Sequence, residues 1–356
     1  MQRVRSQGVV MAGAALAAIA LSLSACGSSN TTNGGSGSSS LSGTLNASGS
    51  TFQLPFQQSA IQAFKSIQPG MTVNYGGGGS GKGRSDLAAG VVQFAGSDSP
   101  IPADEVANFK GKKVLYFPVF LGPITMSYNL SGVSNLKLDP AVIADIFQAK
   151  ITKWNDPAIK SLNPGVNLPS TPISLAVRSD SSGTTANFSL FLMTAEPSVW
   201  KLGSSSTINW PSTAHGGNGN GGVAQIIKST PGAIGYVDYA DAKAAGLTYA
   251  SVKNKAGNYI APSPTSASAA GTTVTLKPDL TFAAVWSSNP QAYPITYQSW
   301  VLVFQKQSSA NTAKMLKAYI GYLLGDGQKL LTPLGYAQLP SSIDQKAKAQ
   351  LSKIGT

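Results

Sequence analysis

The stretch ISLAVRSDSSGTTANFSLFL, residues 173–192, decides the fold class, since it joins an apolar run to a polar turn and an amphipathic segment. The apolar run at 173–177 predicts a buried strand, and Ser182-Gly183-Thr184 ahead of helically spaced apolar residues predicts a helix start. Unpaired backbone N–H groups point outward at such a start. Arg178 stands beside them with five fixed donors, and Asp180 can hold its guanidinium while leaving N–H groups for an oxyanion. An ordinary capped helix with a surface ion pair is the alternative.

The same order of strand, turn and helix recurs before residue 100. This repetition is typical of α/β proteins. Ligands of open α/β sheets lie beyond the carboxyl ends of the strands, so these turns and the Ser182-Gly183-Thr184 turn can converge. The strand-like runs are residues 44–47, 71–75 and 91–95; the turns after them are Ser48-Gly49-Ser50-Thr51, residues 76–83 and Gly96-Ser97-Asp98-Ser99-Pro100; the helix-like segments are residues 52–67 and 84–90.

The glycine-rich turn Gly76-x4-Gly81-Lys82-Gly83 nearly matches the phosphate loop of nucleoside triphosphatases. The Ser or Thr that would hold Mg²⁺ in such a loop is replaced by Gly83, which disfavours a nucleotidase. A glycine loop without function is the other alternative.

The order of elements predicts two domains that the chain crosses twice. Strand-like runs at 114–120 and 124–128, joined by Leu121-Gly122-Pro123, precede the Arg178 unit, and the strand-like passage 295–304 follows it. We therefore expect domain I at residues 44–120 and 296–356 and domain II at residues 121–295, with the crossings forming a hinge over a cleft. Helix-like segments at residues 140–148 and 311–324 belong to domains II and I respectively.

Residues 1–25 predict a secretory signal, because a basic start precedes an apolar run that is shorter than a membrane span. The run ends at Leu23-Ser24-Ala25-Cys26, which resembles the bacterial lipoprotein processing box and implies that Cys26 carries lipid. Residues 26–43 would then form a flexible Gly/Ser tether. We expect an exported protein held by lipid on the outer face of the cytoplasmic membrane, in the periplasm or at the cell surface.

The single cysteine, Cys26, excludes an intramolecular disulfide and a thiolate metal cluster. After residue 25 the chain keeps 24 Lys and Arg against 14 Asp and Glu, a net charge of +10. Such an excess suits nucleic acid, anionic lipid or an anionic small ligand. Nucleic acid is disfavoured by the export signal and by the absence of basic runs with interleaved aromatic residues.

Several ordered motifs resemble those of the phosphate-binding proteins of bacterial ABC phosphate importers, over about residues 44–342. The resemblance implies a periplasmic-binding-protein type II fold, with two α/β domains closing on inorganic phosphate. It also implies a monomeric binding protein, not an enzyme, that serves permease subunits and needs no cofactor and no metal. The motifs are Ser48-Gly49-Ser50-Thr51-Phe52, Gly79-Ser80-Gly81, Gly96-Ser97-Asp98-Ser99-Pro100, Ile151-Thr152-Lys153-Trp154-Asn155-Asp156, Arg178-x-Asp180-x-Ser182-Gly183-Thr184, Asn209-Trp210-Pro211, and residues 231–240.

The resemblance assigns nine residues to the phosphate site. They are Thr51 (hydroxyl and N–H), Phe52 (N–H), Ser80 (hydroxyl), Asp98 (acceptor), Arg178 (forked donor), Asp180 (its orienting partner) and the donors Ser182, Gly183 and Thr184. Two positions depart from the family pattern. Lys82 stands where a small residue is common and either strengthens the local field or is solvated, and Ser50 replaces a common alanine, a change we expect to matter little.

Two other functions stay open at this point. A phosphomonoester hydrolase could use hydroxyls near an arginine, but the one histidine, His215, lies in a Gly/Asn-rich stretch and offers neither a triad nor a histidine-rich metal site. A binding protein for sulfate, molybdate or tungstate would have the same fold. Asp98 argues against these fully deprotonated anions, since a carboxylate would face them without a shared proton.

Overall fold

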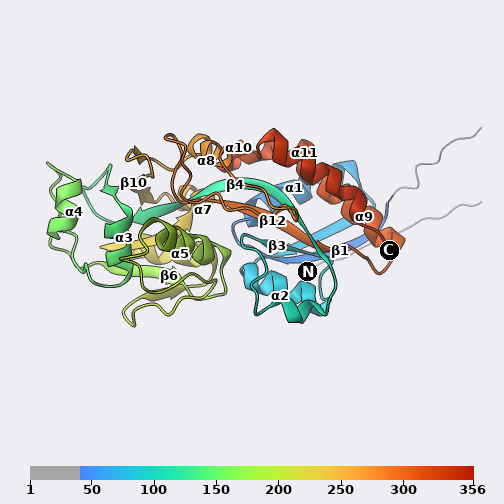
Figure 1. The fold of residues 1–356 in the computed structure, drawn as a ribbon, viewed down its shortest axis with the longest axis horizontal. Helices are drawn as coiled ribbons and strands as arrows, with labels where there is room; N and C mark the ends of the chain where they lie inside the picture. The colour runs from blue at the N-terminus through green and yellow to red at the C-terminus, as the bar shows by residue number, and fades with distance from the viewer. Residues whose placement is uncertain (1–40) are drawn as a thin grey trace, which may run out of the picture. The chain divides into compact units, whose positions relative to one another are not determined.

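The computed structural model describes residues 41–356. The predicted signal at 1–25, the lipid on Cys26 and most of the tether lie outside the described residues. Within them, no helix is at once long enough and apolar enough to cross a membrane. The described part is an α/β structure in which strands alternate with helices along most of the chain (Figure 1).

The first half of the sheet combines strands from both ends of the chain, in the order β2-β1-β3-β12-β4. The strands β1 (Gly43–Gly49), β2 (Met71–Gly76) and β3 (Phe94–Ser97) are parallel to one another, whereas β12 (Thr296–Phe304) is antiparallel to β3 and β4. Helices α1 (Leu54–Ile67) and α2 (Ser80–Ala89) follow β1 and β2, so the turns at the carboxyl ends of the parallel strands share one edge.

The second half of the sheet shares the long strand β4 (Val114–Tyr128) with the first half. The first part of β4 pairs with β12, and its last five residues pair with β8 (Ala233–Asp238). Parallel strands β6 (Ser174–Arg178) and β7 (His215–Gly217) extend it, and β9 (Thr248–Tyr249) pairs with β4. Figure 1 shows β4 and β12 running beside each other between the two halves. The helices of this half include α3 (Pro140–Phe147), α5 (Gly183–Ala195), α6 (Gly219–Ser229) and α7 (Tyr239–Ala245).

The remaining elements cover or extend the sheet. Helix α9 (Ala310–Leu324) packs against β1 and α1, and α11 (Ser341–Gln350) packs against β4. A small separate sheet pairs β5 (Lys137–Leu138), β10 (Ser251–Lys253) and β11 (Tyr259–Ile260). The short helices are η1 (Val106–Phe109), α4 (Pro157–Leu162), α8 (Pro264–Gly271), η2 (Asp326–Leu330), α10 (Leu331–Leu334) and η3 (Leu351–Lys353).

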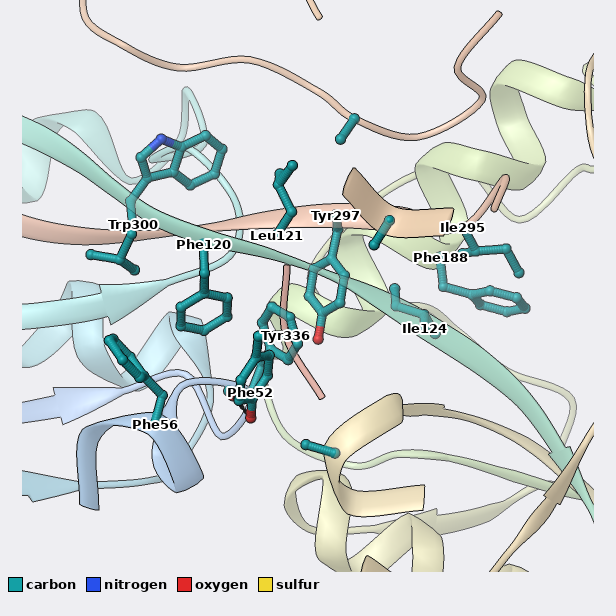
Figure 2. Close-up of a cluster of buried hydrophobic side chains, with 14 of the residues drawn as sticks. Phe52, Phe56, Phe120, Leu121, Ile124, Phe188, Ile295, Tyr297, Trp300 and Tyr336 are labelled. Carbon is teal, nitrogen blue, oxygen red and sulfur yellow. Dashed lines mark hydrogen bonds between the residues drawn. The ribbon is translucent and has the colours of Figure 1, made fainter. Parts of the chain in front are cut away.

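A buried aromatic cluster supports the turn that follows β1 (Figure 2). The Phe52 ring stacks on Tyr297 of β12 with 4.0 Å between ring centroids, and its edge meets Phe120 of β4. The Tyr336 hydroxyl donates a 2.8 Å hydrogen bond to the backbone carbonyl of Phe52. Since these side chains are buried and tightly packed, the cluster fixes the Thr51-Phe52 turn against the two crossing strands.

The predicted break at Leu121-Gly122-Pro123 is wrong. Residues 114–120 and 124–128 form one strand, β4, because β12 pairs with residues 114–123, through the predicted break, and β8 pairs with residues 124–128. A register shift in that pairing accommodates Pro118, and proline is tolerated at such irregularities.

The strand predicted at residues 91–95 begins later, at Phe94, and ends at Ser97. The Val91 N–H instead donates to the Asp86 carbonyl and closes the turn after α2. The helix predicted at residues 84–90 begins earlier, at Ser80, so its first turn lies beside the candidate site.

Candidate anion-binding site

Five turns that follow strands meet at the candidate site, three from the first half of the sheet and two, after β6 and β7, from the second. A Cβ placed on Gly183 would lie 2.3 Å from the Ser80 hydroxyl and 2.7 Å from a carboxylate oxygen of Asp98. Gly81 donates its N–H to the Ser181 carbonyl at 3.0 Å. Glycine at these positions therefore allows the two backbones an approach that any side chain would prevent.

Arg178 ends β6 with its side chain almost fully buried. Its guanidinium donates from Nε to one Asp180 oxygen at 2.7 Å and from a terminal nitrogen to the other. The other terminal nitrogen lies 3.3 Å from the Thr184 hydroxyl and 3.4 Å from the Asn220 side-chain oxygen. One face of the fork is thus held rigid while other N–H groups remain for a ligand.

Asp180 is suited to hold that arginine as an ion. Its burial raises the pKa, but the hydrogen bonds and positive charge of Arg178 outweigh burial and lower the pKa below the usual value. The Gly219 N–H adds a 3.0 Å hydrogen bond to the same carboxylate. Asp180 therefore stays ionised at neutral pH and does not face the ligand as a proton donor.

Backbone N–H groups supply further donors at the starts of three helices. Among the described residues we find no acceptor for the N–H groups of Thr51, Phe52, Ser80, Gly183 and Thr184. Ser182 caps α5, with its hydroxyl accepting a 3.1 Å hydrogen bond from the N–H of Thr185. The first N–H groups of a helix have no partner within it and attract anions.

Asp98 is the one carboxylate aimed into these turns with only hydroxyl partners. It lies directly after β3, is 1% exposed, and accepts hydrogen bonds from Ser50 at 2.6 Å and Ser80 at 3.3 Å on one oxygen. The Ser299 hydroxyl donates to its other oxygen. Since a carboxylate can accept about four hydrogen bonds, this arrangement leaves capacity on the second oxygen.

The charge state of Asp98 is finely balanced. Burial raises the pKa of its carboxyl, whereas the hydrogen bonds from Ser299 and Ser50, the charge of Arg178 and the hydrogen bond from Ser80 lower it, and the pKa is about 6. At neutral pH the carboxylate is mostly ionised and accepts hydrogen bonds, and below about pH 6 it is protonated.

Three residues that contact this site were not assigned to it from the sequence. Asn220 donates from both its N–H and its side-chain amide to the Thr51 hydroxyl at 3.3 Å, and Ser50 and Ser299 bind Asp98. Ser50 was expected to matter little. Its 2.6 Å hydrogen bond to the buried carboxylate of Asp98 gives it a larger structural part than that expectation allowed.

Two basic residues near the turns do not face the site. Lys82 is 54% exposed in its side chain and pairs with Asp86 at 2.8 Å on the surface of α2. Arg84 is fully buried, makes a two-pronged ion pair with Glu105 at 2.7 Å, and donates to the Ser99 hydroxyl at 3.0 Å. Arg84 thus braces the turn that carries Asp98.

The groups needed for hydrolytic chemistry do not gather here. His215 is exposed at the start of β7. Across residues 41–356 no group of three His, Cys, Asp or Glu side chains is placed to hold a metal ion.

Comparison with known proteins gives one consistent family. A family model described as a PBP superfamily domain matches residues 34–327. Phosphate-binding protein PstS 3 of Mycobacterium tuberculosis is 35% identical, with 95% of this chain and 96% of the relative covered, and phosphate-binding protein PstS of Pasteurella multocida is 34% identical over 86% and 89%. The solved structure of a phosphate-binding protein from Stenotrophomonas maltophilia aligns with a TM-score of 0.71, at 17% identity, over 87% of this chain and 94% of that one. This chain therefore belongs to the PBP superfamily and, within it, to the family of the PstS phosphate-binding proteins.

Proposed function

We propose that this chain binds inorganic phosphate between the turns of its two half-sheets and delivers it to the permease subunits of an ABC importer. The observation that carries the proposal is the pairing of many buried donors with a single buried acceptor. Arg178 and the helix-start N–H groups provide the donors, and Asp98 is the acceptor. The proposed phosphate site comprises the nine residues named from the sequence, of which Asp180 acts by orienting Arg178. The relatives' names support the ligand.

The acceptor favours phosphate over other tetrahedral oxyanions. At neutral pH phosphate carries at least one O–H, which can donate to the Asp98 carboxylate. Sulfate and molybdate only accept, so one of their oxygens would meet that carboxylate without a proton between them. A buried charge left in this way costs about 1–3 kcal/mol or more.

Binding without catalysis fits the residues around the donors better than hydrolysis does. A hydrolase needs an activated nucleophile with a base within hydrogen-bond reach. The hydroxyls of Ser50, Ser80 and Ser299 all donate to Asp98, and the single histidine, His215, is exposed at the start of β7 and makes no hydrogen bond to them.

We further propose the remaining features of a lipid-anchored importer subunit. Residues 44–120 with 296–356 and residues 121–295 form the two lobes, with the crossings on β4 and β12 as the hinge. Lipid on Cys26 holds the monomeric protein on the outer face of the cytoplasmic membrane. The shared long strand and the hydrogen bonds between the opposing turns support a closing motion about these strands.

Calorimetric titration of the chain from Gly27 onward with phosphate, sulfate and a phosphomonoester tests this function. We expect heat with phosphate, little with sulfate, and no turnover of the ester. Absence of phosphate binding, or catalytic release of phosphate from the ester, would overturn it.

A further inference from the structure

The edge of the sheet opposite the anion site carries positive charge that phosphate binding does not use. Lys112 and Lys113 precede β4 and Lys306 follows β12, and the three line one cavity of 660 Å³. In the antiparallel pair Val114 lies opposite Phe304, so these lysines share one edge. On β12, Ser299, which binds Asp98, lies five residues before Phe304, about 16 Å away at roughly 3.3 Å per residue.

The charge at this edge is uncompensated. Lys112, Lys113 and Lys306 are exposed, and none of them takes part in an ion pair among the described residues. No acidic side chain lines the cavity. The Lys112 ammonium lies 5.1 Å from the centre of the Phe304 ring, which places an aromatic face beside the charge.

An exposed apolar side chain, that of Val91, lies next to these lysines. Val91 is 64% exposed and is flanked by Gly90 and Val92, which both line the same cavity. The Val91 N–H donates a 2.9 Å hydrogen bond to the Asp86 carbonyl, which fixes the backbone at this residue. Surfaces that bind the headgroup region of membranes typically combine lysines with exposed apolar or aromatic groups, as this surface does.

The chain enters the described part at this same edge. Gly43 begins β1, and the Ser42 carbonyl accepts a 3.0 Å hydrogen bond from Asn311 at the start of α9. Residues 27–40, which are mostly Gly, Ser, Thr and Asn, separate Cys26 from this edge in the sequence. If Cys26 carries lipid, as proposed above, the described part is tethered to the bilayer at this edge, and the tether strengthens even weak contacts by raising their effective concentration.

We infer that the surface formed by Val91, Lys112, Lys113 and Lys306, here called the basic edge, binds the surface of an anionic phospholipid bilayer. The lysines contact the negative headgroups, and Val91 enters the headgroup layer. Because Asp98 lies beside Ser299, five residues along β12 from Phe304, this contact leaves the site clear of the bilayer. The contact is independent of phosphate and needs no lipid on the protein.

Vesicle binding of the chain from Gly27 onward tests the basic edge without the lipid anchor. We expect binding to vesicles containing phosphatidylglycerol, little binding to pure phosphatidylcholine, and weakening as salt rises. Each lysine near an anionic surface strengthens binding by about fivefold, so replacing Lys112, Lys113 and Lys306 together by Ala should weaken binding by up to about 100-fold. The corresponding triple change to Arg should retain it.

A matched control removes the same charge elsewhere. Lys153, Lys160 and Lys228 are exposed lysines of residues 121–295 that make no ion pair in the described part of the chain, and their triple change to Ala should leave vesicle binding within about threefold of the parent. Unchanged phosphate titrations would verify that all variants fold. Equal losses in both triple variants, no preference of the parent for anionic vesicles, or full competition by soluble glycerol phosphate would each overturn the inference.

Discussion

Replacing Asp98 by Asn should change which oxyanion the protein selects. The substitution keeps the size of the side chain but removes the negative charge and adds two N–H donors. Phosphate loses a charge-assisted hydrogen bond from its O–H, whereas sulfate gains a donor in place of a repelling carboxylate. We therefore expect sulfate binding to rise relative to phosphate binding, even if phosphate affinity itself changes little.

The size of the change follows from the burial of the group. Asp98 is 1% exposed, so solvent screens its charge weakly. A hydrogen bond to a charged group contributes about 1.5–3 kcal/mol, and about 1.4 kcal/mol corresponds to a tenfold change in affinity. The ratio of sulfate to phosphate affinity should therefore rise by about 10- to 100-fold, as measured by competition titrations near pH 7.5.

The pKa of Asp98 adds a test that uses pH alone. With a pKa of about 6, the carboxyl of the parent protein is ionised above that pH and protonated below it. As pH falls through about 6, the protonated carboxyl becomes a donor, and rejection of sulfate should weaken in the parent. Asn at the same position cannot titrate, so the variant should lack this step while sharing any effect of phosphate's own ionisation.

One result would refute the reasoning directly. If the Asp98→Asn variant rejects sulfate as strongly as the parent at every pH, Asp98 is not the discriminating group. Selectivity would then come from the geometry of the donors around Thr51, Ser80 and the capped turn at Ser182.

Three further predictions concern the donors, the closure of the turns and the anchor. Arg178→Ala should weaken phosphate binding by 100-fold or more, because several charge-assisted hydrogen bonds of about 1.5–3 kcal/mol are lost, whereas Lys82→Ala should weaken it by less than about threefold. If calorimetry shows similar effects for both variants, residues 178–184 form only an ordinary capped helix start. Gly183→Ala should weaken phosphate binding by at least tenfold, since its Cβ would lie 2.3 Å from the Ser80 hydroxyl in the opposite turn. Gly221→Ala, with open space around its Cβ, should bind phosphate as the parent does. If both variants bind phosphate equally well, binding does not require the two turns to meet. Cys26→Ser should leave an unprocessed or soluble form after fractionation, and tight membrane association of that variant freed of its leader would reveal another anchor.

Local sequence was enough to predict most strand-turn-helix units. The Arg178 turn is the plainest case, because Asp180 and Ser182 follow within a few residues and a cap needs only neighbours in the chain. The same holds for the start of α3, where Asp139 caps the helix and Pro140 opens it.

Residues contributed by distant segments could not be predicted in the same way. Ser299 reaches Asp98 because β12 runs antiparallel to β3, with Trp300 opposite Ser97, and no local pattern encodes that register. Asn220 reaches Thr51 only when the two halves of the structure face each other. The stretch around Ser299 resembles an ordinary buried strand, and the stretch around Asn220 resembles a glycine-rich loop.

The break predicted at Leu121-Gly122-Pro123 failed for a related reason. Glycine and proline usually interrupt a strand, but β12 pairs with β4 through Gly122 and Pro123, and β8 pairs with the residues that follow. Two rings of the aromatic cluster, Phe120 and Tyr297, belong to these crossing strands and are fully buried. Packing across the crossing therefore outweighs the local preference for a turn.

The donors of the site also explain why closure should depend on the ligand. The N–H groups of Thr51, Phe52, Ser80, Gly183 and Thr184 have no acceptor within the described residues, and each buried donor left without one costs about 1–3 kcal/mol. An anion can accept from all of these donors together, whereas the protein groups alone cannot, so bringing the turns together without an anion is unfavourable unless water enters. In the proposed site, the ligand would stabilise the closed arrangement by its differential affinity for it. The acceptor, Asp98, would then make closure depend on a proton on the anion as well, which would couple the choice of ligand to the motion itself.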